Sequence, residues 1–181
     1  MKTLNKLTKL MNNSPNIERD EKGLIPPYGG ELKQLILRDK NQIKDLLSAI
    51  NFEHECSERN ACDVELLIIG AFSPLEGFMN QEDYNSVTKY NRDTKGFLFG
   101  LPIVLDTDND DFKIGKKILL KFKGQNLGVL EIESKWEPEK ELEAQFCYGT
   151  TSLEHPAVKM IFQERGKYYI GGKIYGFELP K

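Results

Sequence analysis

Apolar residues recur at helical spacing in the first half of the chain. Leucines and isoleucines at positions 43, 46, 47 and 50 form a stripe, which predicts a helix over residues 38–50. A second helix is predicted to begin after Ser57, a good N-cap residue, and to end at Gly70. One side of this helix carries the apolar residues Ala61, Val64, Leu67 and Ile68.

The pattern changes around residue 80. Asn80, with Asp83 three residues on, resembles a capping box, so QEDYNSVTKY is predicted to form a short helix. Pro138 and Pro156 each open a further helix. Runs rich in β-branched and aromatic residues predict strands. These strands are LPIVLD at 101–106, two strands around a turn at 123–126, and two short strands pinched at Gly171 and Gly172.

The order of these elements indicates the fold class. Strands and short helices are mixed without a β-α-β rhythm, which favours an α+β domain with a curled, partly closed sheet over a parallel doubly wound one. The sequence contains neither G-x-G-x-x-G nor a P-loop, so a phosphate-cradling loop is not supported.

Composition narrows the class of protein. Charged residues make up 29% of the chain, but the net charge is only −3. Binding to nucleic acid or anionic lipid in bulk needs a clear basic excess, so nucleic-acid binding is not expected. No apolar run is long enough for a membrane helix, and we expect a cytoplasmic protein. The three cysteines are too few for a disulfide framework and are expected to be free thiols.

The N-terminal residues are basic at first but lack the continuous apolar stretch of a secretory signal. Their lysines and leucines are compatible with a weak amphipathic or transit-like helix, which the residues from Asn12 to Pro15 would stop early. We therefore expect a flexible N-terminal extension over residues 1–22, followed by one domain over residues 23–181.

Two groups of residues contain side chains of the types that bind metal ions. The first, His54, Cys56 and Cys62, lacks a second closely spaced ligand pair, which favours ordinary packing. The second lies in the run DTDNDD and comprises Asp106, Asp108, Asp110 and Asp111. This run lacks the glycine and distal glutamate of a calcium loop, which favours a solvated acidic turn. We assign no metal site.

Three further positions could carry chemistry or binding. His155, beside a helix-opening proline, could be an acid/base or an anion contact, although a structural hydrogen bond is favoured. Ser73 lies in F-S-P and not in G-x-S-x-G, so a nucleophile elbow is not expected. The aromatic pair of the last strand segment could stack RNA bases beside nearby lysines, although a core position is favoured. This set comprises Tyr168, Tyr169, Lys167 and Lys173.

Five segments occur in the order and at the spacing of one enzyme family. They are GLIPPYGGEL (23–32), CDVELLIIGAFSPLEGFMNQEDYNSV (62–87), LPIVLD (101–106), LGVLEIESKWEPEKELEAQFCYGTTSLEHPAV (127–158) and KYYIGGKIYGFELP (167–180). Together they closely resemble the N-terminal part of sulfate adenylyltransferases, also called ATP sulfurylases. The resemblance covers about residues 22–181.

The resemblance implies a PUA-like pseudo-barrel of mostly antiparallel strands with short helices around it. It also implies a role in sulfate assimilation, or in sulfur oxidation, which uses the same reaction in the opposite direction. Enzymes of this family join ATP and sulfate into adenosine 5′-phosphosulfate and pyrophosphate. A sulfate oxygen attacks the α-phosphorus, so catalysis depends on positioning and charge neutralisation. Mg²⁺ accompanies the nucleotide, and Mg-ATP is therefore a ligand of the full enzyme.

The family's catalytic residues lie in a second, nucleotidyltransferase-like domain, marked by a glutamine–any–arginine–asparagine–proline run and a histidine pair. Here Arg59 and Asn60 are followed by Ala61, and the two histidines are His54 and His155. No catalytic residue and no cofactor is therefore assigned to this chain, and its substrate-binding residues are unknown. The implied partners are the C-terminal catalytic domain of the same enzyme and further copies of the chain. Without that domain, we expect the chain to be inactive.

Two details follow from the same resemblance. Tyr28 stands where the family usually has the histidine of a P-H-G-G turn, but Gly29 and Gly30 keep the turn itself. The loop GAFSPLEGFM at 70–79 is expected to serve packing, with Phe72 and Phe78 buried against the barrel.

Two other functions stay open. The chain could be a stand-alone PUA-like binding module for RNA or a protein partner, as related folds bind RNA. It could also be a scaffold or regulatory partner for a separately encoded catalytic chain.

Overall fold

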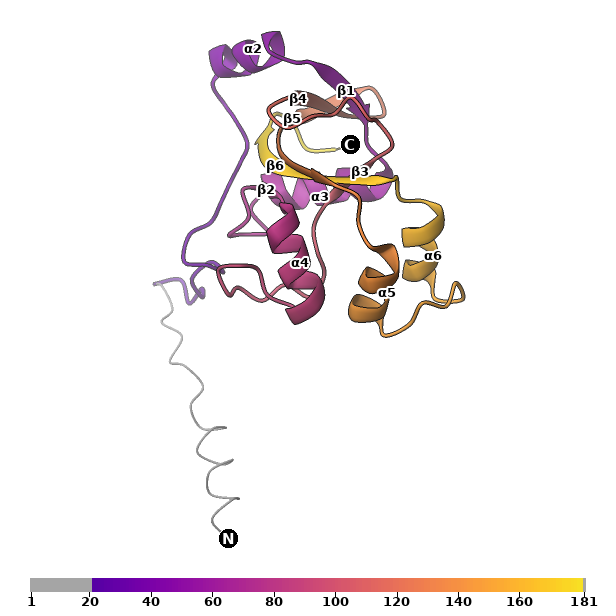
Figure 1. The fold of residues 1–181 in the computed structure, drawn as a ribbon. Helices are drawn as coiled ribbons and strands as arrows, with labels where there is room; N and C mark the ends of the chain where they lie inside the picture. The colour runs from indigo at the N-terminus through magenta and orange to yellow at the C-terminus, as the bar shows by residue number, and fades with distance from the viewer. Residues whose placement is uncertain (1–20, 181) are drawn as a thin grey trace.

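The computed structural model describes residues 21–180, which form five helices and one mixed sheet (Figure 1). The predicted flexible extension at 1–22 lies outside the described residues, except for its last two positions. The helices are α2 (Lys40–Ser48), α3 (Glu58–Ile68), α4 (Gln81–Tyr90), α5 (Lys140–Tyr148) and α6 (Pro156–Gln163). The strands are β1 (Phe52–Glu55), β2 (Gly77–Phe78), β3 (Leu105–Thr107), β4 (Lys117–Phe122), β5 (Gln125–Trp136) and β6 (Tyr168–Gly176).

The sheet confirms an α+β fold with mostly antiparallel strands. Its order is β1-β4-β5-β6-β2, and β3 also pairs with β6. β1 runs parallel to β4, whereas the other pairs are antiparallel. Within residues 21–180, no pairing joins β1 to β2 or β3, so the sheet is curled but not closed into a barrel.

The predicted hairpin turn follows from local backbone chemistry. Lys123 and Gly124 connect β4 to β5, with φ angles of 48° and 79°. Two consecutive positive φ values match the twist of a two-residue hairpin turn.

Two helix starts confirm the predicted caps. The Ser57 side chain accepts a hydrogen bond from the Asn60 N–H, at 3.1 Å, and begins α3. The Asn80 side chain accepts one from the Asp83 N–H, at 2.8 Å, and begins α4. The Asp83 carboxylate instead accepts hydrogen bonds from Thr94, so only one half of the predicted capping box forms.

The main core lies between α3 and the sheet. α3 contacts β4 and β6, and its predicted apolar side is buried. The residues of this face share one cluster with strand residues such as Ile118, Leu120, Leu130 and Ile174. A second cluster lies between α4 and the sheet, around Trp136 and Tyr169. By contrast, α2 is helical as predicted, yet none of its residues is buried.

The prediction of two short final strands is wrong, because β6 is continuous through Gly171 and Gly172. At these two glycines, the backbones of β5 and of the segment that follows β2 lie very close to β6. A Cβ atom on Gly171 would overlap the Met79 carbonyl, and one on Gly172 would overlap the Glu131 carbonyl. The glycines therefore permit close approach of three chain segments, and they do not end a strand.

Two other boundaries differ from expectation. LPIVLD contributes only its last two residues to β3. Helix α5 begins at Lys140, two residues after Pro138. Strand β1, which the sequence pattern did not reveal, pairs with a segment about 65 positions further along the chain.

No helix among residues 21–180 is long and apolar enough to cross a membrane.

Candidate functional site

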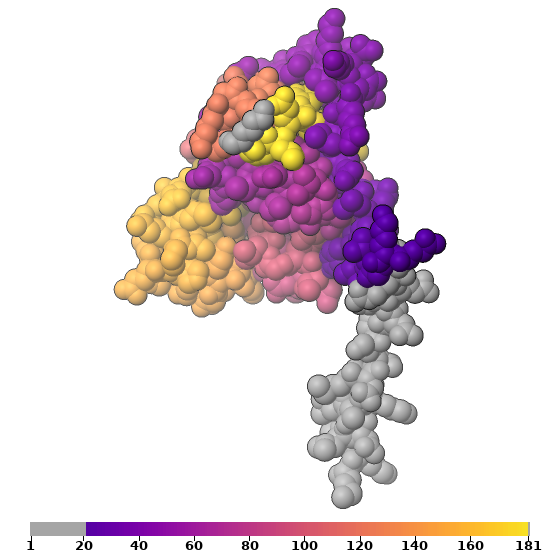
Figure 2. All heavy atoms as spheres, turned by 180° about the vertical axis from the view of Figure 1, so that it is seen from behind, coloured from indigo at the N-terminus to yellow at the C-terminus, as the bar shows by residue number. Residues whose placement is uncertain are grey.

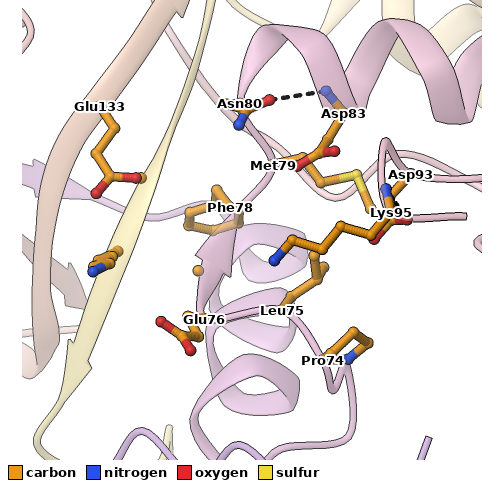
Figure 3. Close-up of a pocket in the computed structure, with 13 residues that line it drawn as sticks. Pro74, Leu75, Glu76, Phe78, Met79, Asn80, Asp83, Asp93, Lys95 and Glu133 are labelled. Atoms are coloured by element: carbon orange, nitrogen blue, oxygen red, sulfur yellow. Dashed lines mark hydrogen bonds between the residues drawn. The ribbon is translucent and has the colours of Figure 1, made fainter. Parts of the chain in front are cut away.

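A pocket of about 210 Å³ opens beside the 70–79 loop (Figure 3). Its walls come from four parts of the chain: the end of this loop with β2, the start of α4, the loop at 93–95, and strands β5 and β6. Figure 3 shows Glu76, Glu133 and Lys95 reaching toward the pocket from three of these segments.

The loop that frames the pocket is fixed by its own hydrogen bonds. Gly70 has a φ of 84° and ends α3. The buried Ser73 hydroxyl donates to the Gly70 carbonyl at 2.6 Å and accepts from the Lys33 N–H at 2.9 Å. This hydroxyl therefore ties the loop to residues 32–34, and the expectation that Ser73 is no nucleophile agrees with its position.

The burial of the two loop phenylalanines differs. Phe78 lies in β2 and is only 3% exposed. Phe72 packs against the main cluster but is only partly buried, so its expected burial holds in part. The difference arises because Phe78 belongs to a sheet strand, whereas Phe72 lies in the turn that precedes Ser73.

The charges of the pocket are mixed. Asp93 is buried and accepts hydrogen bonds from the backbone N–H groups of Lys95 and Phe97. Glu76 forms an ion pair with Lys33, with 3.4 Å between the charged atoms. The residues that line this pocket include no histidine, cysteine or serine. The arrangement can therefore bind a polar group through its lysine and carboxylate side chains, and its lining offers no imidazole, thiol or serine hydroxyl.

The structure places the first suspected metal ligands in different environments. Cys56 is buried, and burial raises the pKa of its thiol to about 12. Burial also lowers the pKa of His54, which contacts the Phe112 ring. Cys62 is exposed on α3. Within residues 21–180, no three histidine, cysteine or acidic side chains are grouped so that they could hold a metal ion.

Asp108, Asp110 and Asp111 are exposed, as predicted for a solvated acidic turn at DTDNDD, but the prediction is wrong for Asp106. Asp106 has a side chain only 13% exposed, and it accepts a hydrogen bond from Arg59 at 2.7 Å. It also accepts from the Gly166 N–H at 2.9 Å, while Asp108 accepts from the Lys167 N–H at 2.7 Å. These carboxylates anchor the segment between α6 and β6 to the start of the acidic run.

Tyr168 and Tyr169 have separate roles. Tyr169 is fully buried, which confirms the core position favoured for it and prevents base stacking. The Tyr168 ring lies under the Lys135 ammonium group, 4.1 Å from the ring centre. That ammonium also donates to the carbonyls of Asn109 and Asp110. Lys135 is therefore engaged in holding the acidic turn, and the structure does not favour RNA stacking at Tyr168.

Within the described residues, the structural hydrogen bond expected of His155 is not formed by its Nδ1 atom. His155 is the N-cap residue of α6, but its side chain makes no capping hydrogen bond. Its Nδ1 atom is buried and has no hydrogen-bond partner among residues 21–180. The ring instead packs against Tyr148, with 5.2 Å between ring centres.

A buried ionic network was missed by the sequence reasoning. Glu143 on α5 is 1% exposed, and its carboxylate pairs with Arg165 at 2.6 Å. It also accepts from the hydroxyls of Tyr84, at 3.0 Å, and Tyr169, at 2.9 Å. Burial, with the nearby Glu143 charge, raises the pKa of Tyr84. The network thus joins α4, α5 and β6, although the buried Arg165 Nε has no hydrogen-bond partner among residues 21–180.

The turn that contains Tyr28 in place of the family's histidine keeps the backbone conformation expected from its two glycines. Gly29 and Gly30 both have positive φ angles, of 80° and 87°. The Tyr28 hydroxyl accepts a hydrogen bond from the Leu98 N–H, and its ring meets Phe97 edge-on at 5.7 Å. Tyrosine at this position therefore attaches the turn to the 90–101 loop.

Comparisons with known proteins agree with this fold. A family described as "PUA-like domain" matches residues 25–179. A sulfate adenylyltransferase of Neurospora crassa is 44% identical over an alignment 162 residues long, which covers 82% of this chain and 27% of that protein. One of Candida albicans is 39% identical over an alignment 170 residues long, which covers 86% of this chain and 32% of that protein. The chain thus spans about a quarter to a third of the length of these relatives.

A solved structure shows the same arrangement. The hexameric APS kinase from Thiobacillus denitrificans superposes with a TM-score of 0.63 at 25% sequence identity. The match covers 87% of this chain and 28% of that one.

Proposed function

The chain belongs to the PUA-like domain family, and from this premise we propose that it is the N-terminal domain of a sulfate adenylyltransferase. On this proposal residues 23–181 form the domain, which supports a catalytic domain that follows it. The observation that carries the proposal is the 44% identity over 82% of this chain, together with a match to only 27% of the relative.

The proposed reaction of the whole protein joins sulfate and ATP into adenosine 5′-phosphosulfate and pyrophosphate. A sulfate oxygen forms a bond to the α-phosphorus while the bond to the pyrophosphate leaving group breaks. Positioning and neutralisation of phosphate charge are the main requirements of such a transfer. Mg-ATP is proposed as the nucleotide form used by the whole protein, in the cytoplasm, for sulfate assimilation.

The geometry of the described residues fits a supporting role. The lining of the pocket beside the 70–79 loop includes no histidine, cysteine or serine, and the Glu143 carboxylate is engaged by Arg165, Tyr84 and Tyr169 of the same domain. We therefore assign no catalytic residue here. The hexameric relative makes an oligomer the favoured state of the whole protein.

A domain exchange tests the proposal directly. Residues 22–181 replace the matching part of the Neurospora crassa enzyme, and pyrophosphate release from Mg-ATP and sulfate is measured. We expect the chimera to retain activity well above that of the 181-residue chain, which should show none. The matched control is the same chimera with Gly172→Ala, which should lose activity as the domain loses its packing.

Two results would contradict the proposal. One is a chimera that is folded by circular dichroism but has only background activity. The other is an intact mass of 20.8 kDa for the protein isolated from its own cells, which would favour a stand-alone binding module.

A further inference from the structure

Three charged side chains in the lining of the pocket beside the 70–79 loop are not engaged by other groups. They are Lys95, Glu133 and Lys173, whose charged atoms make no hydrogen bond or ion pair with any residue of the described range 21–180. All three are exposed. Two ammonium groups and one carboxylate of this pocket are therefore available to a ligand.

The other carboxylates of the lining already have partners. They are those of Glu76, Asp83 and Asp93. The Asp83 carboxylate accepts from the N–H and the hydroxyl of Thr94, at 3.0 and 2.6 Å. These carboxylates hold the walls of the pocket in place, and they also keep its local charge from being simply positive.

Glu133 is directed at the pocket by an irregularity of β5. Its neighbours Ile132 and Ser134 are opposite adjacent residues of β6, so Glu133 is the extra residue of a β-bulge. A bulge changes the direction of a side chain and is common beside functional sites. The Ser134 hydroxyl accepts from the Gln81 N–H at 3.1 Å, which fixes the bulge to the start of α4. Figure 3 shows the Glu133 side chain reaching toward the pocket.

The two lysines approach from other segments. Lys173 precedes Ile174 on β6, and Ile174 belongs to the cluster that includes the buried face of α3. Successive side chains of a strand point to opposite faces, so Lys173 projects away from α3, which Figure 2 shows in purple to magenta on the rear of the molecule. Lys95 comes from a loop whose backbone is held by Asp93, and Figure 3 shows its side chain extending into the pocket.

We propose that this pocket binds a small zwitterion of the α-amino-acid class, with the ligand's ammonium group at Glu133 and its carboxylate at Lys95 and Lys173. A simple anion would meet four carboxylates in the lining, and a simple cation would meet two ammonium groups without partners. A ligand that carries both charges pairs with both kinds of group. This binding requires neither a catalytic domain nor a nucleotide, so it goes beyond the proposed function and is tested separately from it.

The size and the apolar part of the wall narrow the ligand further. The volume of about 210 Å³ is below the roughly 300–1,000 Å³ of sites for drug-sized molecules, which favours a single amino acid over a nucleotide. Half-buried Pro74 and Leu75 line the same pocket (Figure 3). This apolar wall suits an aliphatic side chain on the ligand.

Isothermal titration calorimetry of the 181-residue chain tests the proposal with three probes that share one side chain. L-leucine carries both charges, 4-methylpentanoate carries only the carboxylate, and 3-methylbutylamine carries only the ammonium group. We expect saturable binding of L-leucine with a Kd at or below about 1 mM. Each of the other probes should bind at least about tenfold more weakly, because it lacks one charge-assisted contact.

Variants assign each end of the ligand to its partner. Glu133→Gln should reduce the affinity for L-leucine to that for 4-methylpentanoate. Lys95→Met/Lys173→Met should reduce it to that for 3-methylbutylamine. The matched controls, Glu82→Gln and Lys116→Met, remove exposed charges outside the lining and should leave the affinity within error of the wild type.

Three results would overturn the proposal. The first is the absence of saturable binding of L-leucine in the millimolar range. The second is equally tight binding of either singly charged probe, since the pocket would then be a site for a simple anion or cation. The third is wild-type affinity for L-leucine in a Glu133→Gln variant that is folded by circular dichroism.

Discussion

The ion pair between Glu143 and Arg165 is the strongest test of the structure. Both side chains are nearly fully buried, at 1% and 7% exposed, so neither charge can be solvated if the other is removed. Breaking such a pair by removing one partner costs about 3–5 kcal/mol of folding free energy. Glu143→Gln keeps the side-chain volume but removes the charge that faces Arg165, and we expect a loss in this range.

The double variant separates the pair from its surroundings. Arg165→Met should also cost about 3–5 kcal/mol, because the Glu143 carboxylate is then left with only the two tyrosine hydroxyls. The combined variant should cost less than the sum of the two by about 2 kcal/mol, because neither charge is left without the other.

Urea unfolding followed by fluorescence provides the measurement. Trp136 is the single tryptophan of the sequence, and it lies 5.3 Å from the Tyr84 ring and 6.0 Å from the Tyr169 ring. Its emission therefore reports on this region. Arg59→Met, which breaks a more exposed pair with Asp106, serves as the control and should cost about 1 kcal/mol. A loss below about 1 kcal/mol for Glu143→Gln, or additive single effects, would refute the reasoning.

Three further predictions concern other parts of the fold. Phe78→Ala should lower the free energy of unfolding by about 3–5 kcal/mol, because the Phe78 ring is buried. Phe72→Ala should lower it by clearly less, because the Phe72 ring is only partly buried. Equal losses for the two variants in urea unfolding would contradict this difference in burial. Gly172→Ala should abolish cooperative unfolding or lower the melting temperature sharply, because the added Cβ would overlap the Glu131 carbonyl. The control, Gly100→Ala, has open space around the added Cβ and should change the free energy of unfolding by less than about 0.5 kcal/mol. Burial lowers the pKa of His54 in the folded state, so as the pH falls the unfolded chain takes up the His54 proton before the folded chain does. The free energy of unfolding is therefore highest above the usual pKa of 6.5 and decreases as the pH falls below that value. Unfolding at about pH 7.5 and pH 5 should show this loss in the wild type and a smaller one in His54→Gln, and an equal loss in both would assign the pH dependence to other groups.

Predictions from local sequence signals are reliable where a few neighbouring residues decide the structure. The caps at Ser57 and Asn80 act on N–H groups three residues away, and the turn at Lys123 and Gly124 depends on their own φ angles. Helical spacing likewise identified the buried side of α3. The resemblance of five ordered segments identified the family, which the match over residues 25–179 confirms.

Residues whose partners are far along the chain could not be interpreted in this way. Asp106 in an acidic run looks solvated until Arg59, 47 positions earlier, is placed beside it. Glu143 has the pattern of a surface helix residue, and only the approach of Arg165 and Tyr169 makes it a buried ion. The 70–79 loop was predicted to pack, but its sequence did not show that a pocket opens beside it.

The starts of the helices, the position of the hairpin turn and the family of the chain can be predicted from the amino-acid sequence, because they depend on neighbouring residues and on their order. The parallel pairing of β1 with β4, the open sheet of the described residues and the place of Gly171 and Gly172 inside one strand are evident only in the folded protein. The physical reason is that a glycine favours a turn and a close approach of backbones equally well, and only the segments that meet it determine which of the two it serves.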